Sequence, residues 1–116
     1  MAQATHVDSV VRQGVLVATI KSPAVSLYEA DVIGRQIESE APGAMWRIAI
    51  DFSHVELLAS AGLGMLVKLQ KTASDHKGKL VLAGLSKETV DVLKMTRLNR
   101  ILAIETDIEE AVRKLC

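Results

Sequence analysis

Short apolar segments separated by turn-forming residues predict the strands of this protein. Val15–Ile20 is rich in β-branched residues, and together with His6–Arg12 and the turn residue Gly14 it predicts a β-hairpin. Pro23 ends the second strand, because proline cannot donate a backbone hydrogen bond to a neighbouring strand. Three later apolar segments predict further strands: Trp46–Asp51, Lys79–Ala83 and Ile101–Ile104.

Apolar positions at helical spacing predict a first helix after Ser26. Residues Ser26-Leu-Tyr-Glu29 have the spacing of a capping box, in which the hydroxyl and the carboxylate each satisfy a backbone N–H group. The segment Pro42-Gly43 ends this helix. Four apolar residues fall on its inner face: Ala30, Ile33, Ile37 and Ala41.

Polar residues of the capping type mark three more helix starts. Ser60 is the expected N-cap of the second helix, whose first turns are almost wholly apolar and which Gly78 ends. Ser86 caps a short third helix, and Asp107 opens a last helix that runs through Leu115. The residues expected in the core from the second and third helices include Met65, Val90, Leu93 and Met95.

The predicted elements follow the order β-β-α-β-α-β-α-β-α. Strands that alternate with helices require crossover connections and therefore a mainly parallel sheet. The sequence has no internal repeat and no linker-like segment. Residues 1–116 are therefore expected to form a single α/β domain, with an edge hairpin at the N-terminus and helices packed on the sheet.

Charge and composition narrow the classes of function. The 116 residues carry 14 Lys plus Arg and 14 Asp plus Glu, and this balance argues against nonspecific binding to nucleic acid while permitting a weak homodimer. Three aromatic residues, Tyr28, Trp46 and Phe52, are too few for a base-stacking platform. Five lysines are expected to be dispersed over a solvated face: Lys68, Lys71, Lys77, Lys79 and Lys87.

Candidate ligands for a metal or a cofactor are equally few. Cys116 is the single cysteine, and the three histidines have no spacing that places two imidazoles on one metal. Gly62-Leu-Gly64 opens a helix, but Val67 stands where a dinucleotide-binding fingerprint needs a third glycine. These glycines are interpreted as small residues that let the helix start pack tightly, so neither a cofactor nor a metal is expected.

The N-terminal residues contain no basic leader, and no apolar run reaches the roughly 18 residues that span a bilayer. We therefore expect a cytoplasmic protein without membrane insertion.

Ser60 has three candidate roles. As a helix cap it contributes about 1 kcal/mol. A nucleophile needs a histidine base, but only His54 is near in sequence and the Gly-x-Ser-x-Gly elbow is missing. As a phosphorylation site, Ser60 would place about −1.5 to −2 charges at a helix start, where free N–H groups tolerate a phosphate but an apolar partner would not.

Asp51 and His54 leave two interpretations open. They flank Phe52-Ser53, where a catalytic pair is one interpretation and an aspartate that ties a turn is the other. No convergent set of titratable groups accompanies them, so a catalytic or small-ligand-binding domain ranks last among the functions, and no catalytic residue is expected.

The segment Ile50-Asp-Phe-Ser-His-Val-Glu-Leu-Leu-Ala-Ser-Ala-Gly-Leu-Gly resembles the signature of STAS domains, in the branch of the anti-sigma factor antagonists. That signature is a strand ending in Asp-Leu-Ser, followed by a loop similar to Asp-Ser-Ser-Gly-Leu-Gly. Gly78-Lys-Leu-Val-Leu-Ala and Val92-Leu-Lys-Met-Thr-Arg-Leu-Asn-Arg-Ile also resemble later segments of the family. The resemblance extends from about Val7 to Leu115 and implies the fold derived above.

The resemblance implies a partner switch. In this family an unphosphorylated antagonist binds an anti-sigma factor that is also a GHKL-type serine kinase; phosphorylation breaks the complex, and a serine phosphatase restores it. The phosphorylated serine of the family aligns with Ser60. The implied partner-binding residues are Ser26, Ala59, Ser60, Ala61, Gly62, Leu63 and Gly64.

Three departures from the family pattern support an alternative function. Ala59 replaces an aspartate before the phosphorylated serine, Lys21–Ser26 replaces an acidic Gly-Glu-Leu-Asp stretch, and Arg97 replaces a glycine. The first two favour a STAS module that docks constitutively in a signalling or transport assembly and is never phosphorylated.

Overall fold

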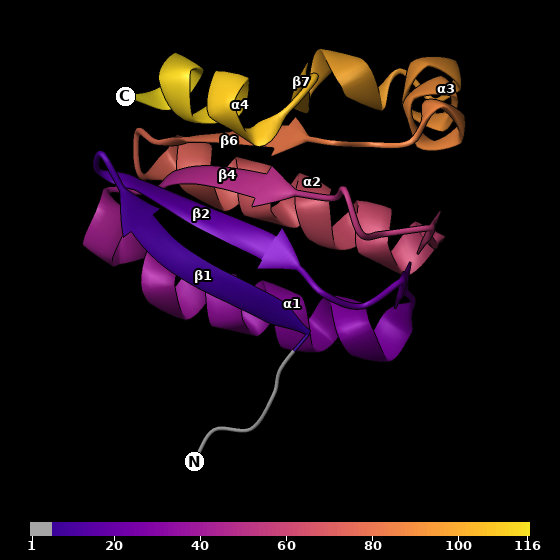
Figure 1. Ribbon diagram of the computed structural model, residues 1–116, viewed down its shortest axis with the longest axis horizontal. Helices are drawn as coiled ribbons and strands as arrows, with labels where there is room; N and C mark the ends of the chain where they lie inside the picture. Colours follow the sequence, from indigo (N-terminus) through magenta and orange to yellow (C-terminus); the bar gives the residue numbers. More distant parts are fainter. Residues whose placement is uncertain (1–5) are drawn as a thin grey trace.

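A mixed five-stranded sheet forms the centre of the molecule, and the computed structural model describes residues 6–116. The strands are Val7–Arg12 (β1), Val15–Ile20 (β2), Arg47–Asp51 (β4), Lys79–Ala83 (β6) and Ala103–Glu105 (β7). Their order is β1-β2-β4-β6-β7, with β1 antiparallel to β2 and every later pair parallel (Figure 1). This arrangement confirms the predicted edge hairpin and mostly parallel sheet.

Within residues 6–116 there are four α-helices: Leu27–Glu40 (α1), Ser60–Asp75 (α2), Lys87–Met95 (α3) and Ile108–Leu115 (α4). The helices α1 and α2 lie side by side on one face, and α4 lies on the other (Figure 1). The alternation of side chains along a strand supplies both cores. In β2, for example, Leu16 and Ala18 pack beneath α1 and α2, whereas Val15 and Val17 pack against α4.

The first helix agrees closely with its sequence pattern. The capping box predicted for Ser26 and Glu29 is present, and the helix ends at Glu40, before the 3₁₀ turn Ala41–Ala44 (η1). The four residues predicted for its inner face are all buried: Ala30, Ile33, Ile37 and Ala41. Pro42 therefore ends the α-helix as predicted, because it lacks the N–H group that the next turn requires.

The hairpin between β1 and β2 closes through two residues with positive φ. Gln13 has φ 55° and Gly14 has φ 78°, while Arg12 pairs with Val15. Two successive left-handed residues are the signature of the type I′ turn, whose twist matches that of the strands it joins. Gly14 is therefore at the predicted turn.

The structure contains a second, small sheet that the sequence pattern did not predict. It consists of Ala24–Val25 (β3) and Leu57–Leu58 (β5), which pair in parallel. Strands of two residues carry no periodic signal of their own. They form because the tertiary structure brings the two connecting segments together.

The C-terminal half contains two further differences from the prediction. The last strand is Ala103–Glu105 rather than Ile101–Ile104, because the 3₁₀ turn Leu98–Arg100 (η2) precedes it and leaves Ile101 half-exposed. The prediction that Met95 lies in the core is wrong, since its side chain is 81% exposed at the end of α3. Leu93, which was also expected in the core, is fully buried.

Arg97 adopts a left-handed conformation directly after the C-cap of α3, with φ 64° and ψ 16°. A residue with a Cβ pays roughly 1 kcal/mol for this conformation, which glycine adopts freely. We expect Arg97→Gly to raise the free energy of unfolding by about 1 kcal/mol in urea denaturation. Lys94→Gly, inside the same helix, is the control and should lower it by a similar amount. An unchanged stability of Arg97→Gly would contradict this expectation.

Candidate functional site

Two connecting segments meet at the carboxyl ends of neighbouring strands. The strands β2 and β4 are parallel neighbours, so the segments that follow Ile20 and Asp51 leave the sheet at the same end. The Pro23 carbonyl accepts hydrogen bonds from Glu56 N (2.7 Å) and Leu57 N (3.0 Å). The structure therefore brings together the Pro23–Ser26 loop and the start of α2, as the topology of a parallel sheet predicts.

Ser60 is the first residue of α2 rather than its N-cap, so the prediction of a capping role is wrong. Ala59 is the N-cap, with extended backbone (φ −78°, ψ 170°) and no side-chain hydrogen bond to the helix. Its N–H donates to the Val25 carbonyl at 3.0 Å, and its own carbonyl accepts from Gly62 and Leu63. The backbone of β3 therefore determines where the helix begins.

The Ser60 hydroxyl is consequently unused. Its side chain is exposed, and no described residue hydrogen-bonds to it. The N–H groups of Ser60 and Ala61 likewise find no carbonyl partner within residues 6–116, as is usual for the first turn of a helix. A free hydroxyl thus lies at the positive end of a 16-residue helix that has no acidic residue in its first turn.

The two glycines at the start of α2 have different roles. Gly62 is buried, and a Cβ there would overlap the Leu58 side chain and lie 3.2 Å from Val25 Cγ1. This contact confirms the interpretation that a small residue lets the helix start pack tightly. Gly64 has no such contact, because a Cβ there would meet nothing within 4 Å.

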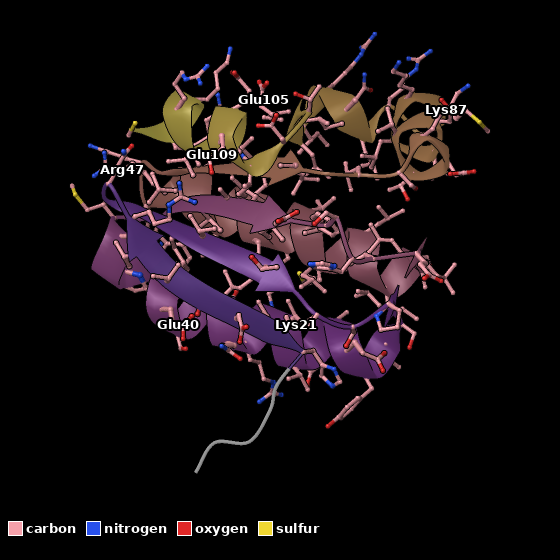
Figure 2. All side chains as sticks on the ribbon, viewed as in Figure 1. Lys21, Glu40, Arg47, Lys87, Glu105 and Glu109 are labelled. Atoms are coloured by element: carbon pink, nitrogen blue, oxygen red, sulfur yellow. The ribbon has the colours of Figure 1, made fainter. Side chains whose placement is uncertain are left out.

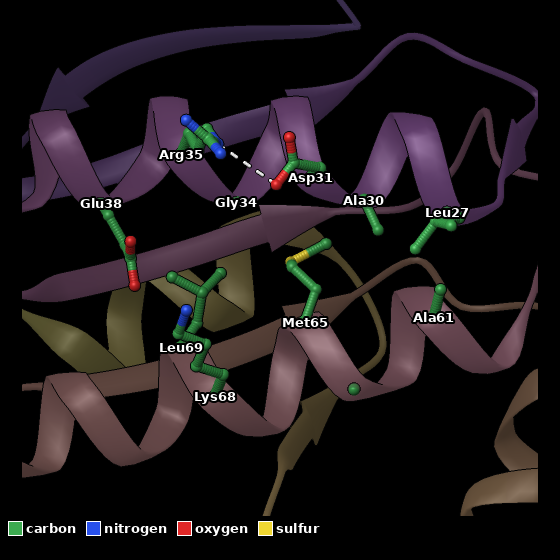
Figure 3. A pocket seen from close by; sticks show the side chains of 11 residues that line it. Leu27, Ala30, Asp31, Gly34, Arg35, Glu38, Ala61, Met65, Lys68 and Leu69 are labelled. Carbon is green, nitrogen blue, oxygen red and sulfur yellow. Dashed lines mark hydrogen bonds and ion pairs between the residues drawn. The ribbon is translucent and has the colours of Figure 1, made fainter.

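Gly64 instead opens onto a groove between α1 and α2, which we call the α1–α2 groove (Figure 3). Its volume is about 520 Å³, and its apolar lining includes Leu27, Ala30, Gly34, Ala61, Met65 and Leu69. Met65 packs against the core as predicted and also reaches toward α1, where it lies against Gly34. Asp31 and Arg35 form an ion pair of 3.2 Å at the rim.

A smaller hollow of about 150 Å³ lies on the other side of the helix start. Leu57, Leu58 and Leu63 line it together with Val92 of α3. The side chains of Leu57 and Val92 are 60% and 41% exposed. The exposure of Leu27, Leu57 and Val92 could not be predicted from the sequence, because apolar residues in a periodic pattern normally face the core.

Ser26 lies beside this site and holds an acidic side chain. Glu29 Oε1 accepts hydrogen bonds from the Ser26 hydroxyl (2.6 Å) and from Ser26 N (3.1 Å). The hydroxyl bond is the main reason that the pKa of Glu29 is lowered below its ordinary value. The capping box therefore keeps Glu29 ionised next to the Pro23–Ser26 loop.

We expect Ser26→Ala to raise the pKa of Glu29 toward its ordinary value, because the bond that favours the carboxylate is lost. In the wild type the lowered pKa adds stability above the unfolded-state pKa, and this contribution disappears as the pH falls through the folded-state value. The variant should lose less stability on acidification. A carboxyl NMR titration measures the pKa directly, and an unchanged value would contradict the assignment of its cause.

Asp51 ties the turn after β4. Its Oδ1 accepts a hydrogen bond from Ser53 N at 2.9 Å, whereas His54 is exposed and has no hydrogen bond to Asp51. This geometry supports the turn-tying interpretation over the catalytic pair. In residues 6–116 there is also no group of three His, Cys, Asp or Glu side chains placed to hold a metal ion.

Charged side chains of both signs are interspersed over the surface (Figure 2). The five lysines of the predicted solvated face are all exposed: Lys68, Lys71, Lys77, Lys79 and Lys87. Among the described helices, none combines the length and apolar character needed to cross a membrane.

Comparison with known proteins identifies the family. Residues 6–111 match the model of the STAS domain. The chain belongs to the STAS family. This membership confirms the resemblance found in the sequence, and proteins of this family are generally non-catalytic binding modules.

Three solved structures show how widely this STAS fold occurs. A candidate anti-sigma factor antagonist of Thermotoga maritima is 23% identical, with a TM-score of 0.82 over 94% of this chain and 93% of that one. The Bacillus cell fate determinant SpoIIAA in its phosphorylated form is 18% identical, with a TM-score of 0.72 over 95% and 99%. The murine anion transporter Slc26a9 is 15% identical, with a TM-score of 0.73 over 88% of this chain and 18% of the transporter.

Proposed function

We propose that this STAS domain is a cytoplasmic anti-sigma factor antagonist that acts as a phosphorylation-controlled partner switch. In its unphosphorylated form it binds an anti-sigma factor of the GHKL-type serine kinase class. The kinase phosphorylates Ser60 and thereby releases itself, and a serine phosphatase reverses the modification. The domain itself has no catalytic role in this scheme. SpoIIAA, which shares the fold, has been solved in a phosphorylated form.

The observation that carries this proposal is the free hydroxyl of Ser60 at the uncapped start of α2. A kinase needs an accessible hydroxyl without a competing structural task. The unpaired N–H groups of the first helical turn also accommodate a phosphate, so that modification leaves the fold intact.

The surroundings of Ser60 explain how phosphorylation would release a partner. The α1–α2 groove lies on one side of the helix start and the hollow around Leu57 and Leu63 on the other. Apolar side chains line much of both surfaces, with charged side chains among them, so a partner that covers them removes water from Ser60 as well. A phosphate of about −1.5 to −2 charges would then lose its hydration at the interface, which opposes binding.

The proposal is tested by intact-mass and peptide mass spectrometry of the protein purified from its own host with phosphatase inhibitors present. We expect a fraction of the wild type to carry one phosphoryl group, assigned to Ser60. Ser60→Ala should lack it, and Ser74→Ala, which changes an exposed serine in the last turn of the same helix, is the matched control that should retain it. An unmodified wild type under several growth conditions would contradict the switch.

The second candidate function is a constitutive docking module in a larger signalling or transport assembly. The N-cap Ala59 and the Lys21–Ser26 segment favour it, because neither places an acidic side chain at the position where the family pattern has one. The occurrence of the same fold within the transporter Slc26a9 is consistent with it. An unmodified Ser60, together with co-purification in a stable assembly, would support this alternative.

A further inference from the structure

The strand β1 is a long edge strand of the sheet. It contains six residues, whereas the opposite edge strand, β7, contains three. Edge strands of natural proteins are commonly blunted by proline, a bulge or charged side chains; β1 has no proline and no bulge, and its charged residues, Asp8 and Arg12, are of opposite sign. Two apolar side chains, Val10 and Val11, are instead 55% and 52% exposed on it. Figure 1 shows β1 as the outermost strand of the sheet.

The turn geometry determines which backbone groups of β1 face outward. Because Arg12 and Val15 flank a two-residue turn, they form a hydrogen-bonded pair, and every second residue of β1 repeats this bonding to β2. The bond from Lys21 N to the His6 carbonyl at 2.7 Å fits the same alternation. Ser9 and Val11 therefore direct their N–H and C=O groups away from β2.

We propose that β1 pairs antiparallel with β1 of a second copy of this chain, in the register that places Val10 opposite Val10. In this register Ser9 of one copy lies opposite Val11 of the other, so their outward N–H and C=O groups bond in both directions. The two Val10 side chains meet at the two-fold axis, where antiparallel partners without hydrogen bonds approach most closely.

Charge complementarity favours this register. The register centred on Val10 places Asp8 of each copy opposite Arg12 of the other, so that two opposite-charge pairs flank the central valines. A shift of the centre to Ser9 would place Asp8 opposite Val10, and a shift to Val11 would place Arg12 opposite Val10. Either shift loses both charge pairs and places a charged side chain opposite Val10.

The charged groups have room for this additional contact. Asp8 is bonded to Lys21 at 3.1 Å and Arg12 to Glu109 at 3.0 Å, yet the Asp8 side chain remains 72% exposed and that of Arg12 40% exposed. A guanidinium has five N–H donors and can therefore bind two carboxylates. The interface would then contain two symmetry-related rows, each made of Glu109 and Arg12 of one copy and Asp8 of the other.

This interface is separate from the Ser60 site and does not depend on the proposed switch. The Ser60 site is built from the segments that follow β2 and β4, whereas the interface uses the outer edge of β1. The dimer would therefore carry two accessible Ser60 sites, and Ser60→Asp should associate as the wild type does.

The test is sedimentation equilibrium of the full chain from micromolar to millimolar concentration. We expect a reversible monomer–dimer equilibrium for the wild type. Val10→Lys should weaken it at least about tenfold, because two ammonium groups would meet at the two-fold axis. Asp8→Arg and Arg12→Asp should each weaken it, whereas the double variant should recover association because opposite charges again face each other.

The thermal midpoint at low concentration, followed by circular dichroism, verifies that each variant is folded. A wild type that stays monomeric throughout, or a folded Val10→Lys that associates equally well, would overturn the proposed interface. Failure of the double variant to recover association would overturn the register centred on Val10.

Discussion

Replacing Gly78 by alanine is expected to lower the free energy of unfolding by about 3 kcal/mol. A Cβ at this position would overlap the backbone oxygen of Trp46 and lie 2.5 Å from the Trp46 Cβ. The same oxygen accepts the hydrogen bond from Lys79 N at 2.9 Å, where β6 begins to pair with β4. The new methyl group therefore displaces backbone within the central sheet, which is far costlier than moving the end of a side chain.

Urea denaturation measures this loss, and Gly64→Ala is the matched control. Gly64 lies inside α2, and a Cβ there would meet nothing within 4 Å. Alanine has the higher helix propensity, so this variant should gain about 0.5–1 kcal/mol. Stability changes of opposite sign for the two variants would show that the loss in Gly78→Ala arises from the close backbone contact and not from replacing a glycine as such. Wild-type stability of Gly78→Ala would contradict the expectation.

Ser60→Asp is expected to weaken binding of the host's GHKL-type serine kinase at least about 100-fold, which is about 2.7 kcal/mol. The carboxylate imitates part of the phosphate charge between the two apolar surfaces that flank the helix start. An acidic residue at the start of a helix is favourable for the fold itself, so the thermal midpoint should stay level or rise slightly. The loss of binding would then arise at the interface rather than from unfolding.

Isothermal titration calorimetry with the purified kinase measures this effect. Ser60→Ala is the control, and it should bind as the wild type does while resisting phosphorylation. Equal binding by Ser60→Asp and the wild type would contradict the switch, as would a kinase that binds neither of them. A loss of binding by Ser60→Ala would show that the hydroxyl itself is needed for docking.

Local patterns in the sequence determined most of the fold. The capping box at Ser26, the helical spacing of Ala30, Ile33 and Ile37, and the apolar strands each reflect interactions between residues close in the chain. Such interactions need no knowledge of the partner element. The alternation of strands and helices then required a parallel sheet, and the motif around Ser60 pointed to the STAS family.

The site depended on contacts that no local pattern contains. The pairing of β3 with β5 made Ala59 the N-cap and left the Ser60 hydroxyl free, although the sequence alone favoured Ser60 as the cap. Likewise, Gly62 and Gly64 look alike in the sequence, but one is enclosed by Leu58 and the other opens onto the α1–α2 groove. The sequence by itself therefore determined the elements and their order, because these follow from local propensity and hydrophobic period. Only the tertiary structure decided which groups remain exposed at the site, because exposure depends on segments distant in the chain.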